Sequence, residues 1–519
     1  MRRFISDLFL RGVMIKFLHG VRRLRFLRCR RKFNRYRIET TIEKLHMKFI
    51  ENAEKRLGAA GGTSFAVAVA FLVKAIGALY KIPLYNLLGD YATGLYGMIF
   101  PLFAFLLCLS GSGVPVAVTR MISGGYDPEK VLKKTMAIFL SDGIVLSVLL
   151  FVFSKFIADL QGDSNAAKLY MAIAPSVFFV GVIAVFRGYF QGLSDMRPTA
   201  FSQLIEQLVR AVIGLIAAYL LPVSQKDKAF FAVLAITFSE LCAAFYFFIL
   251  YYKKSKKTLP SPGVKTAVEA GAKTMPTVGS LMSIAVPLTL NSLLIPLSAL
   301  AEGFIAVRAL RSLFGDNGTA LYGLYAGATE TIISLPAAVL HPLASGFLPK
   351  MNDKKVAARA MLFTVIGGVS AGLIVFVFPQ IIVKILFSGV SNKGVLTELL
   401  RLSSITVALL PILQTMSLIL VAKGAQKRAL FNNTVGAIVK IAVCAVLVYR
   451  AGINVFALAI SDIACYFVAL TLDLIYIITE NKRSDAIEGR SDTNDNVSGT
   501  GYKKGRLVAE SVQSDKTGG

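Results

Sequence analysis

Long apolar segments alternate with short polar ones along most of the chain. A helix needs about 20 apolar residues to cross roughly 30 Å of hydrocarbon, and twelve stretches reach that length. The pattern therefore predicts an all-α polytopic membrane protein with about twelve transmembrane helices. The expected spans are 61–84, 91–118, 136–156, 167–190, 200–221, 229–252, 281–307, 320–348, 357–386, 396–421, 431–448 and 453–478.

A nine-residue motif occurs twice, 226 positions apart. G-D-Y-A-T-G-L-Y-G runs from Gly89 to Gly97 and G-D-N-G-T-A-L-Y-G from Gly315 to Gly323, with six of nine positions identical. Such self-similarity indicates an internal duplication. Six expected spans separate the copies, and an even number returns the chain to the same side of a membrane. The motif therefore predicts two six-helix lobes related by a parallel repeat, with a cavity between them.

The apolar pattern also divides the chain into five regions. Residues 1–57 form a basic N-terminal extension, 58–252 the first lobe, 253–279 a basic, proline-containing cytoplasmic linker, 280–480 the second lobe, and 481–519 a polar tail. The tail is rich in Ser, Asp, Gly and Asn, a composition typical of disorder.

Lys and Arg concentrate in alternate loops, and this asymmetry predicts orientation. The basic loops follow the second, fourth, sixth, eighth and tenth spans, and Arg187 with Arg197 is assigned to the second of them. The loops between them are short and poorer in Lys and Arg, for example the Gln161–Asn165 turn. We expect the basic loops and both termini to be cytoplasmic.

Composition and charge exclude two other classes. A chain that is 55% hydrophobic and only 17% charged is not an ordinary soluble domain. The net charge of +27 could suggest a nucleic-acid partner, but residues 1–46 contribute +11 of it, from fourteen Lys and Arg against three acids. Cytoplasmic loops account for the rest, so no nucleic acid is expected as a partner.

The basic extension leaves three interpretations open. It is an amphipathic anchor on anionic lipid, an RNA-binding arm, or sequence upstream of a true start at Met47 rather than Met1. We favour the third, because Met47 opens a compact polar lead into the first span.

Neither a metal site nor a nucleotide site is predicted. The five cysteines lack paired spacing and the three histidines do not cluster; His341 at a helix end is expected to be structural. No phosphate-binding loop is present in the sequence, so energy is expected to come from an ion gradient or the membrane potential. A coupling ion, Na⁺ or H⁺, is the one candidate cofactor.

Ionisable groups inside spans are costly and tend to face cavities or pathways. In the fifth span a polar stripe lies on one helical face at i, i+3, i+4 and i+7, and its spacing predicts an i,i+4 pair between Glu206 and Arg210. The stripe consists of Gln203, Glu206, Gln207 and Arg210. It is either a clasp between helices or a cavity wall in which Arg210 holds an anion.

Other charges within spans are candidates for cargo or ion binding. The segment I-V-K-I-A-V around Lys440 resembles L-V-R-A-V-I around Arg210. We therefore expect Lys440 to lie opposite Arg210, at nearly the equivalent position of the second repeat. Lys74 lies well inside the first span, and Lys81 seven residues later is interpreted as snorkelling to the interface. The candidates for coupling-ion binding are Glu302, Glu330 and Asp462, and Asp473 is expected to be solvated.

The sequence resembles a known family over roughly 61–480. The run from Ala172 to Arg210, with the F-R-G-Y-F-Q-G motif at Phe186–Gly192 as its most specific piece, closely resembles the polysaccharide-biosynthesis branch of the multidrug/oligosaccharidyl-lipid/polysaccharide (MOP) exporter superfamily. Within that branch, the stage V sporulation protein B group matches best. The K-I-P-L-Y-N-L-L-G-D and S-G-S-G-V-P-V-A-V-T-R segments agree with this resemblance.

The resemblance implies a two-lobed multidrug-exporter-like (MATE-like) fold and a flippase in the bacterial cytoplasmic membrane, with no enzymatic step. Its cargo would be an undecaprenyl-pyrophosphate-linked oligosaccharide, either the peptidoglycan precursor lipid II or a polysaccharide repeat unit for vegetative wall or spore cortex. Related lipid II flippases direct cavity cations toward the pyrophosphate, and the counterparts here would be Lys74, Arg187 and Arg210. Lys440, which corresponds to Arg210 in the repeat, is the fourth candidate for cargo binding. Membrane lipids and a cell-wall polymerase would be its partners.

Two other functions stay open. The related lipid II flippases have fourteen helices, whereas twelve are expected here, and twelve is also the plan of multidrug exporters. A cation-coupled small-molecule antiporter would place the three acids at the centre of the mechanism. A membrane enzyme or scaffold of envelope assembly is less favoured, because the loops between spans are short apart from the basic linker.

Overall fold

The computed structural model describes residues 61–256, 277–348, 351–450 and 452–480. The basic extension, most of the inter-lobe linker and the polar tail lie outside the described residues. Within the described ranges, twelve helical segments are long and apolar enough to cross a membrane. The predicted all-α architecture and the span count are therefore confirmed.

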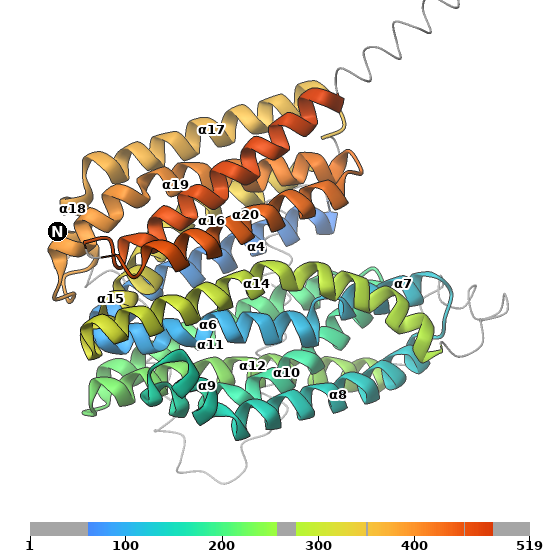
Figure 1. Cartoon of the computed structure of the whole chain (residues 1–519). Helices are drawn as coiled ribbons and strands as arrows, with labels where there is room; N and C mark the ends of the chain where they lie inside the picture. Colours follow the sequence, from blue (N-terminus) through green and yellow to red (C-terminus); the bar gives the residue numbers. More distant parts are fainter. Residues whose placement is uncertain (1–60, 257–276, 349–350, 451, 481–519) are drawn as a thin grey trace, which may run out of the picture. The chain divides into compact units, whose positions relative to one another are not determined.

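Apart from α4, which is drawn beside α16 and α20, the helices of the first half lie next to one another in Figure 1. They are α4 (Gly61–Leu79), α5 (Lys81–Leu88), α6 (Asp90–Gly111), α7 (Val114–Ser123), α8 (Pro128–Val152), α9 (Ser154–Gln161), a 3₁₀ turn η3 (Ser164–Ala166), α10 (Ala167–Gly192), α11 (Arg197–Leu220) and α12 (Gln225–Lys256). α10 is the central helix of this half, since it packs against α6, α7, α8 and α12.

The second half repeats this plan. Its helices are α14 (Val278–Phe314), α15 (Asp316–Gly323), the π-helix η4 (Leu324–Thr329), α16 (Glu330–Gly346), α17 (Lys354–Val377), α18 (Pro379–Leu386), α19 (Lys393–Ala422), α20 (Gln426–Leu447) and a last helix, Phe456–Glu480. α19 packs against both α16 and α17.

Several expected spans are broken into two helices. The second span divides into α6 and α7, where Pro115 lies in the first turn of α7 and a Cβ on Gly113 would overlap the carbonyl oxygen of Ala285. The ninth span ends at Val377, and Pro379 begins α18. Proline fits the first turn of a helix because that turn leaves its N–H groups unpaired. The predicted 357–386 span was therefore too long by one short helix.

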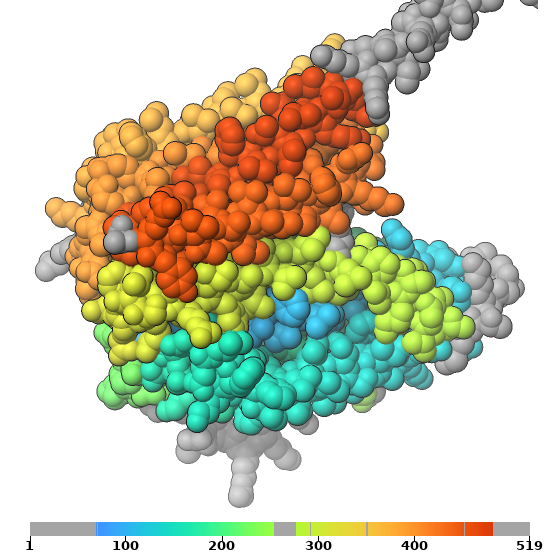
Figure 2. Space-filling view, viewed as in Figure 1, coloured from blue at the N-terminus to red at the C-terminus, as the bar shows by residue number. Residues whose placement is uncertain are grey.

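α14 joins the two halves. It packs against α6, α7 and α9 of the first half and against α15 and α20 of the second. In Figure 2 it forms the yellow-green band between the blue and green surface of the first half and the orange and red surface of the second. Apart from α14, the described elements that pack most closely across the halves are α6 with α15 and η4, and α5 with η4.

The two copies of the duplicated motif pack against each other. A Cβ on Gly94 would overlap the carbonyl oxygen of Thr319, and one on Gly323 would lie 2.5 Å from the carbonyl oxygen of Asp90. Backbone approach of this kind requires glycine. The duplication that the sequence revealed therefore also builds a close contact between the halves.

Candidate functional site

The polar stripe of α11 takes part in two ion pairs with neighbouring helices. Glu206 Oε1 lies 2.5 Å from a terminal nitrogen of Arg187 on α10, and the same nitrogen donates to Ser202 Oγ at 3.0 Å. Arg210 pairs with Glu240 on α12, with 3.0 Å between nitrogen and Oε1. The predicted Glu206–Arg210 ion pair was wrong, because each residue pairs with a residue on an adjacent helix instead.

Arg187 reaches this position through the F-R-G-Y-F-Q-G motif. Gly188 lets α10 approach α7, since a Cβ there would lie 2.9 Å from Pro115 Cα. Phe186 stacks on Phe247 of α12 with ring centroids 5.6 Å apart, and Tyr189 donates to Glu129 at 3.1 Å. The motif thus packs α10 on three sides and turns Arg187 toward α11. Assigning Arg187 to a cytoplasmic loop was wrong, because it lies within α10.

The two glutamines of the stripe are half-buried. Gln207 lies against α4, where its Oε1 would be 2.8 Å from a Cβ on Gly77. Gln203 is one turn away on the same face of α11. The stripe therefore faces helices on both sides, and α4 is one of its neighbours.

The second half holds an acid-rich cluster around Lys440, here called the Lys440 cluster. Lys440 Nζ lies 2.7 Å from Glu302 Oε2 on α14 and 2.7 Å from Asp462 Oδ1 on the last helix. Ser461 Oγ donates to Glu302 at 2.8 Å, and Tyr325 donates to Asp462. Both acidic residues are buried: 5% of the surface of Glu302 and 4% of that of Asp462 is exposed.

Tyr325 is aimed at Asp462 by the π-helix η4. The wider turn is closed in part by Thr329 Oγ1, which donates to the carbonyl oxygen of Leu324 five residues earlier at 2.9 Å. Single π-turns within α-helices often occur at functional sites. This backbone feature was not expected from the sequence.

The two halves repeat the same ionic arrangement. In each, a cation on the fifth span pairs with a carboxylate on the sixth: Arg210 with Glu240, and Lys440 with Asp462. This agrees with the predicted correspondence of Lys440 and Arg210. The halves differ in charge, because Lys440 has a second carboxylate partner, Glu302.

Lys81 and Glu330 lie between these two sets of charges. Each acts electrostatically on the other; Lys81 also interacts with Arg210, and Glu330 with Lys440. Lys81 Nζ lies 5.6 Å from the ring centroid of Phe100, within cation–π range. The snorkelling interpretation of Lys81 placed this residue too far from the charged centre of the protein.

Lys74 differs from the other candidate cations. Its side chain is exposed, and no ion pair is found for it among the described residues. It interacts electrostatically with His341 on α16, a helix of the second half. Asp473, expected to be solvated, is instead fully buried and accepts a hydrogen bond from Asn432 at 2.7 Å.

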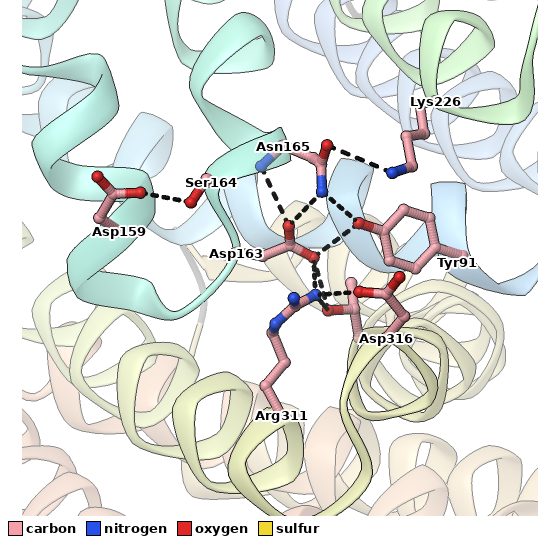
Figure 3. A network of polar contacts seen from close by, with 9 residues as sticks. Tyr91, Asp159, Asp163, Ser164, Asn165, Lys226, Arg311 and Asp316 are labelled. Carbon is pink, nitrogen blue, oxygen red and sulfur yellow. Dashed lines mark hydrogen bonds and ion pairs between the residues drawn. The ribbon is translucent and has the colours of Figure 1, made fainter.

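A further polar network, missed by sequence reasoning, lies around Asp163 (Figure 3). Asp163 Oδ2 accepts hydrogen bonds from Tyr91 at 2.9 Å, from Thr319 at 2.8 Å and from Arg311. These donors come from α6, α15 and α14 respectively. In the sequence, Asp163 lies in a short turn with no recognisable motif. Its partners could have been suspected because Thr319 lies inside the second motif copy and Arg311 shortly before it.

No group of three or more His, Cys, Asp or Glu side chains that could hold a metal ion occurs in the described parts of the chain. The four cysteines in those parts are unpaired.

The comparisons with known proteins agree with this architecture. A family described as polysaccharide biosynthesis protein matches residues 59–353. Stage V sporulation protein B of Bacillus subtilis is 26% identical over 421 residues, covering 77% of this chain and 80% of the relative. Lipid II flippase MurJ of the same organism is 26% identical over 254 residues, covering 46% of this chain and 47% of the flippase.

Solved structures share the fold. An inward-facing multidrug resistance MATE family transporter of the MOP superfamily superposes with a TM-score of 0.60 at 15% identity, covering 80% of this chain and 99% of its own. Lipid II flippase MurJ in an inward closed conformation gives 0.56 at 14% identity, covering 80% and 86%. The resemblance and the MATE-like fold expected from the sequence are confirmed. The chain belongs to the polysaccharide biosynthesis protein family.

Proposed function

We propose that this protein moves an anionic, lipid-linked oligosaccharide across the bacterial cytoplasmic membrane by alternating access, with the termini inside. The cargo class is an undecaprenyl-pyrophosphate-linked sugar, either lipid II or a polysaccharide repeat unit. The observation that carries the proposal is Lys74, an exposed ammonium inside a candidate span with no carboxylate partner among the described residues. A diphosphate is the partner such a group lacks.

Arg187 and Arg210 would act differently from Lys74. Each is already neutralised by a carboxylate, Glu206 or Glu240, so an arriving diphosphate would have to share or displace that partner. Competition of this kind weakens binding and favours release, which a transporter needs more than high affinity. We assign first contact with the headgroup to Lys74, and adjustable contacts to the two arginines.

The first test is complementation of a strain depleted of its lipid II flippase. We expect wild type to restore growth, and Lys74→Ala and Arg210→Ala to fail at matched membrane abundance, because each removes a cation from the cargo path. Lys393→Ala, at the exposed start of α19, is the matched control and should complement. No rescue by abundant wild type would exclude lipid II as the cargo; rescue by both variants would exclude the cationic path.

We further propose that the Lys440 cluster binds the coupling ion. One ammonium faces two carboxylates, so the cluster carries one excess negative charge when both are ionised. Glu330 lies within electrostatic reach, but Lys81 offsets its charge. An uncompensated charge away from water is costly. One proton or one Na⁺ would neutralise the cluster, and its loss would restore the repulsion between the carboxylates.

Ion binding should appear as thermal stabilisation of purified protein. We expect Tm to rise with Na⁺ concentration against a choline control, or with falling pH if the ion is a proton, since a ligand that binds the folded state stabilises it. Asp462→Asn should abolish the response, because it removes the excess charge. A full response in Asp462→Asn would place the ion elsewhere. Asp159→Asn, on the exposed end of α9, is the matched acid control.

A cation-coupled small-molecule antiporter is the second candidate. The acid-rich Lys440 cluster favours it, since a cationic drug would be attracted to carboxylates. Export of a fluorescent organic cation that depends on Asp462 but not on Lys74 would support this function over the first.

A further inference from the structure

Several polar contacts join the two halves close to the duplicated motif. They lie at the same end of the helices. Besides the Asp163 network, Asp90 accepts hydrogen bonds from the backbone N–H of Ser391 at 3.1 Å and of Asn392 at 3.3 Å. Asn86 donates to the carbonyl oxygen of Leu386 at 2.6 Å and accepts from the N–H of Gly389 at 2.9 Å. The residues involved lie in or beside the turns before α6, after α9, after α14 and after α18. The Lys and Arg distribution assigns this end to the outside.

Asp163 is the centre of this end. It is fully buried, and both carboxylate oxygens are occupied: Oδ2 by Tyr91, Thr319 and Arg311, and Oδ1 by the N–H and side-chain amide of Asn165 at 3.1 and 2.9 Å. Arg311 and Thr319 belong to the second half, so separating the halves breaks a charged contact. We call the Asp163–Arg311–Thr319 contact the latch.

The surroundings of the latch suit repeated opening. Beside it, the motif copies meet through Gly94 and Gly323, whose backbones touch. Packing of small residues can separate without pulling large groups out of pockets. Asp163 and Arg311 would be hydrated once water enters, so the latch is strong while closed and inexpensive to hold open.

We propose that the latch and the paired motif copies form the outer gate of the transport cycle, and that breaking the Asp163–Arg311 contact is required for outward opening. The proposal rests on the alternating-access function above. The proposal gives a role to the turn that holds Asp163 and to the duplicated motif, neither of which takes part in the ion pairs of Arg187, Arg210 and Lys440. In the conformation described here, this gate is closed.

The test measures access to the motif contact, independently of any cargo. Thr93 is buried with 4% exposed, beside Gly327 of the other half. In a background with all five cysteines replaced by alanine, Thr93→Cys should react slowly with a membrane-impermeant maleimide added outside intact cells. Adding Asp163→Asn should speed labelling about tenfold, because a charge-assisted contact that held the closed state is lost. Arg311→Gln should act in the same direction.

Two comparisons separate gating from misfolding. Asp159 lies near the end of α9, close in sequence to Asp163, and its side chain accepts a hydrogen bond from nearby Ser164. Asp159→Asn should therefore leave labelling unchanged. Gly97→Cys with Ala326→Cys, whose Cβ atoms would be 3.0 Å apart across the halves, should form a disulfide that Asp163→Asn reduces in yield. Gly111→Cys with Ala184→Cys, 3.6 Å apart within the first half, should form equally in both backgrounds.

The outcomes are decisive in either direction. Faster labelling and fewer cross-links in both latch variants, with the within-half cross-link intact, support the gate even if lipid II proves not to be the cargo. Unchanged labelling in Asp163→Asn and Arg311→Gln overturns it. Loss of the within-half cross-link as well would show that Asp163 only holds the first half together, which also overturns the proposal.

Discussion

Replacing Lys440 by methionine is expected to lower the free energy of unfolding by about 3–5 kcal/mol, the typical cost of removing one partner from a buried ion pair. Lys440 Nζ lies 2.7 Å from a carboxylate oxygen of Glu302 and 2.7 Å from one of Asp462. Without Lys440, these two carboxylates would face each other with no cation between them. Methionine keeps most of the side-chain volume, so the loss is electrostatic. Thermal unfolding of purified protein in detergent measures it, and transport should be lost as well.

Removing the stranded charges should reverse most of this destabilisation. Lys440→Met combined with Glu302→Gln and Asp462→Asn leaves no ionised group in the cluster, so we expect stability near that of wild type. Transport should stay absent, because no ion can bind. Lys393→Met is the control for losing a surface lysine. A stable single variant, or a triple variant no better than the single one, would contradict the electrostatic account.

Gly94→Ala is expected to abolish transport while leaving each half folded. The added methyl would overlap the carbonyl oxygen of Thr319, a backbone atom of the opposite half that cannot rotate away. Overpacking of this kind costs about 1–3 kcal/mol, which corresponds to at least a fivefold loss of the closed state. Complementation measures transport, and maleimide labelling of Thr93→Cys measures separation of the motif copies.

The control for Gly94→Ala is Gly214→Ala on α11. A Cβ there would lie 3.7 Å from Ala235 Cβ, an ordinary contact, and alanine is the better helix former by about 1 kcal/mol. We expect this variant to transport normally and to be slightly more stable. Normal transport by Gly94→Ala would mean that the halves need not approach as closely as described here.

The sequence by itself determined the membrane architecture. Twelve spans could be predicted because hydrocarbon requires backbone hydrogen bonds to be satisfied within each segment, so a long apolar run has one stable conformation, the helix. The duplication was equally readable, since its two copies keep six of nine letters. The candidate charges were found because ionised groups are rare in spans and conspicuous there.

Only the tertiary structure decided how these charges pair. Spacing places Glu206 and Arg210 on one face of a helix, but it cannot say that Arg187 and Glu240 stand on neighbouring helices and compete for them. Asp163 was hidden for the same reason, because its partners Arg311 and Thr319 are about 150 residues away in sequence. Local sequence patterns report what one helix presents, whereas which groups meet depends on how the helices pack. The charged clusters and the contacts of the proposed gate are formed by that packing.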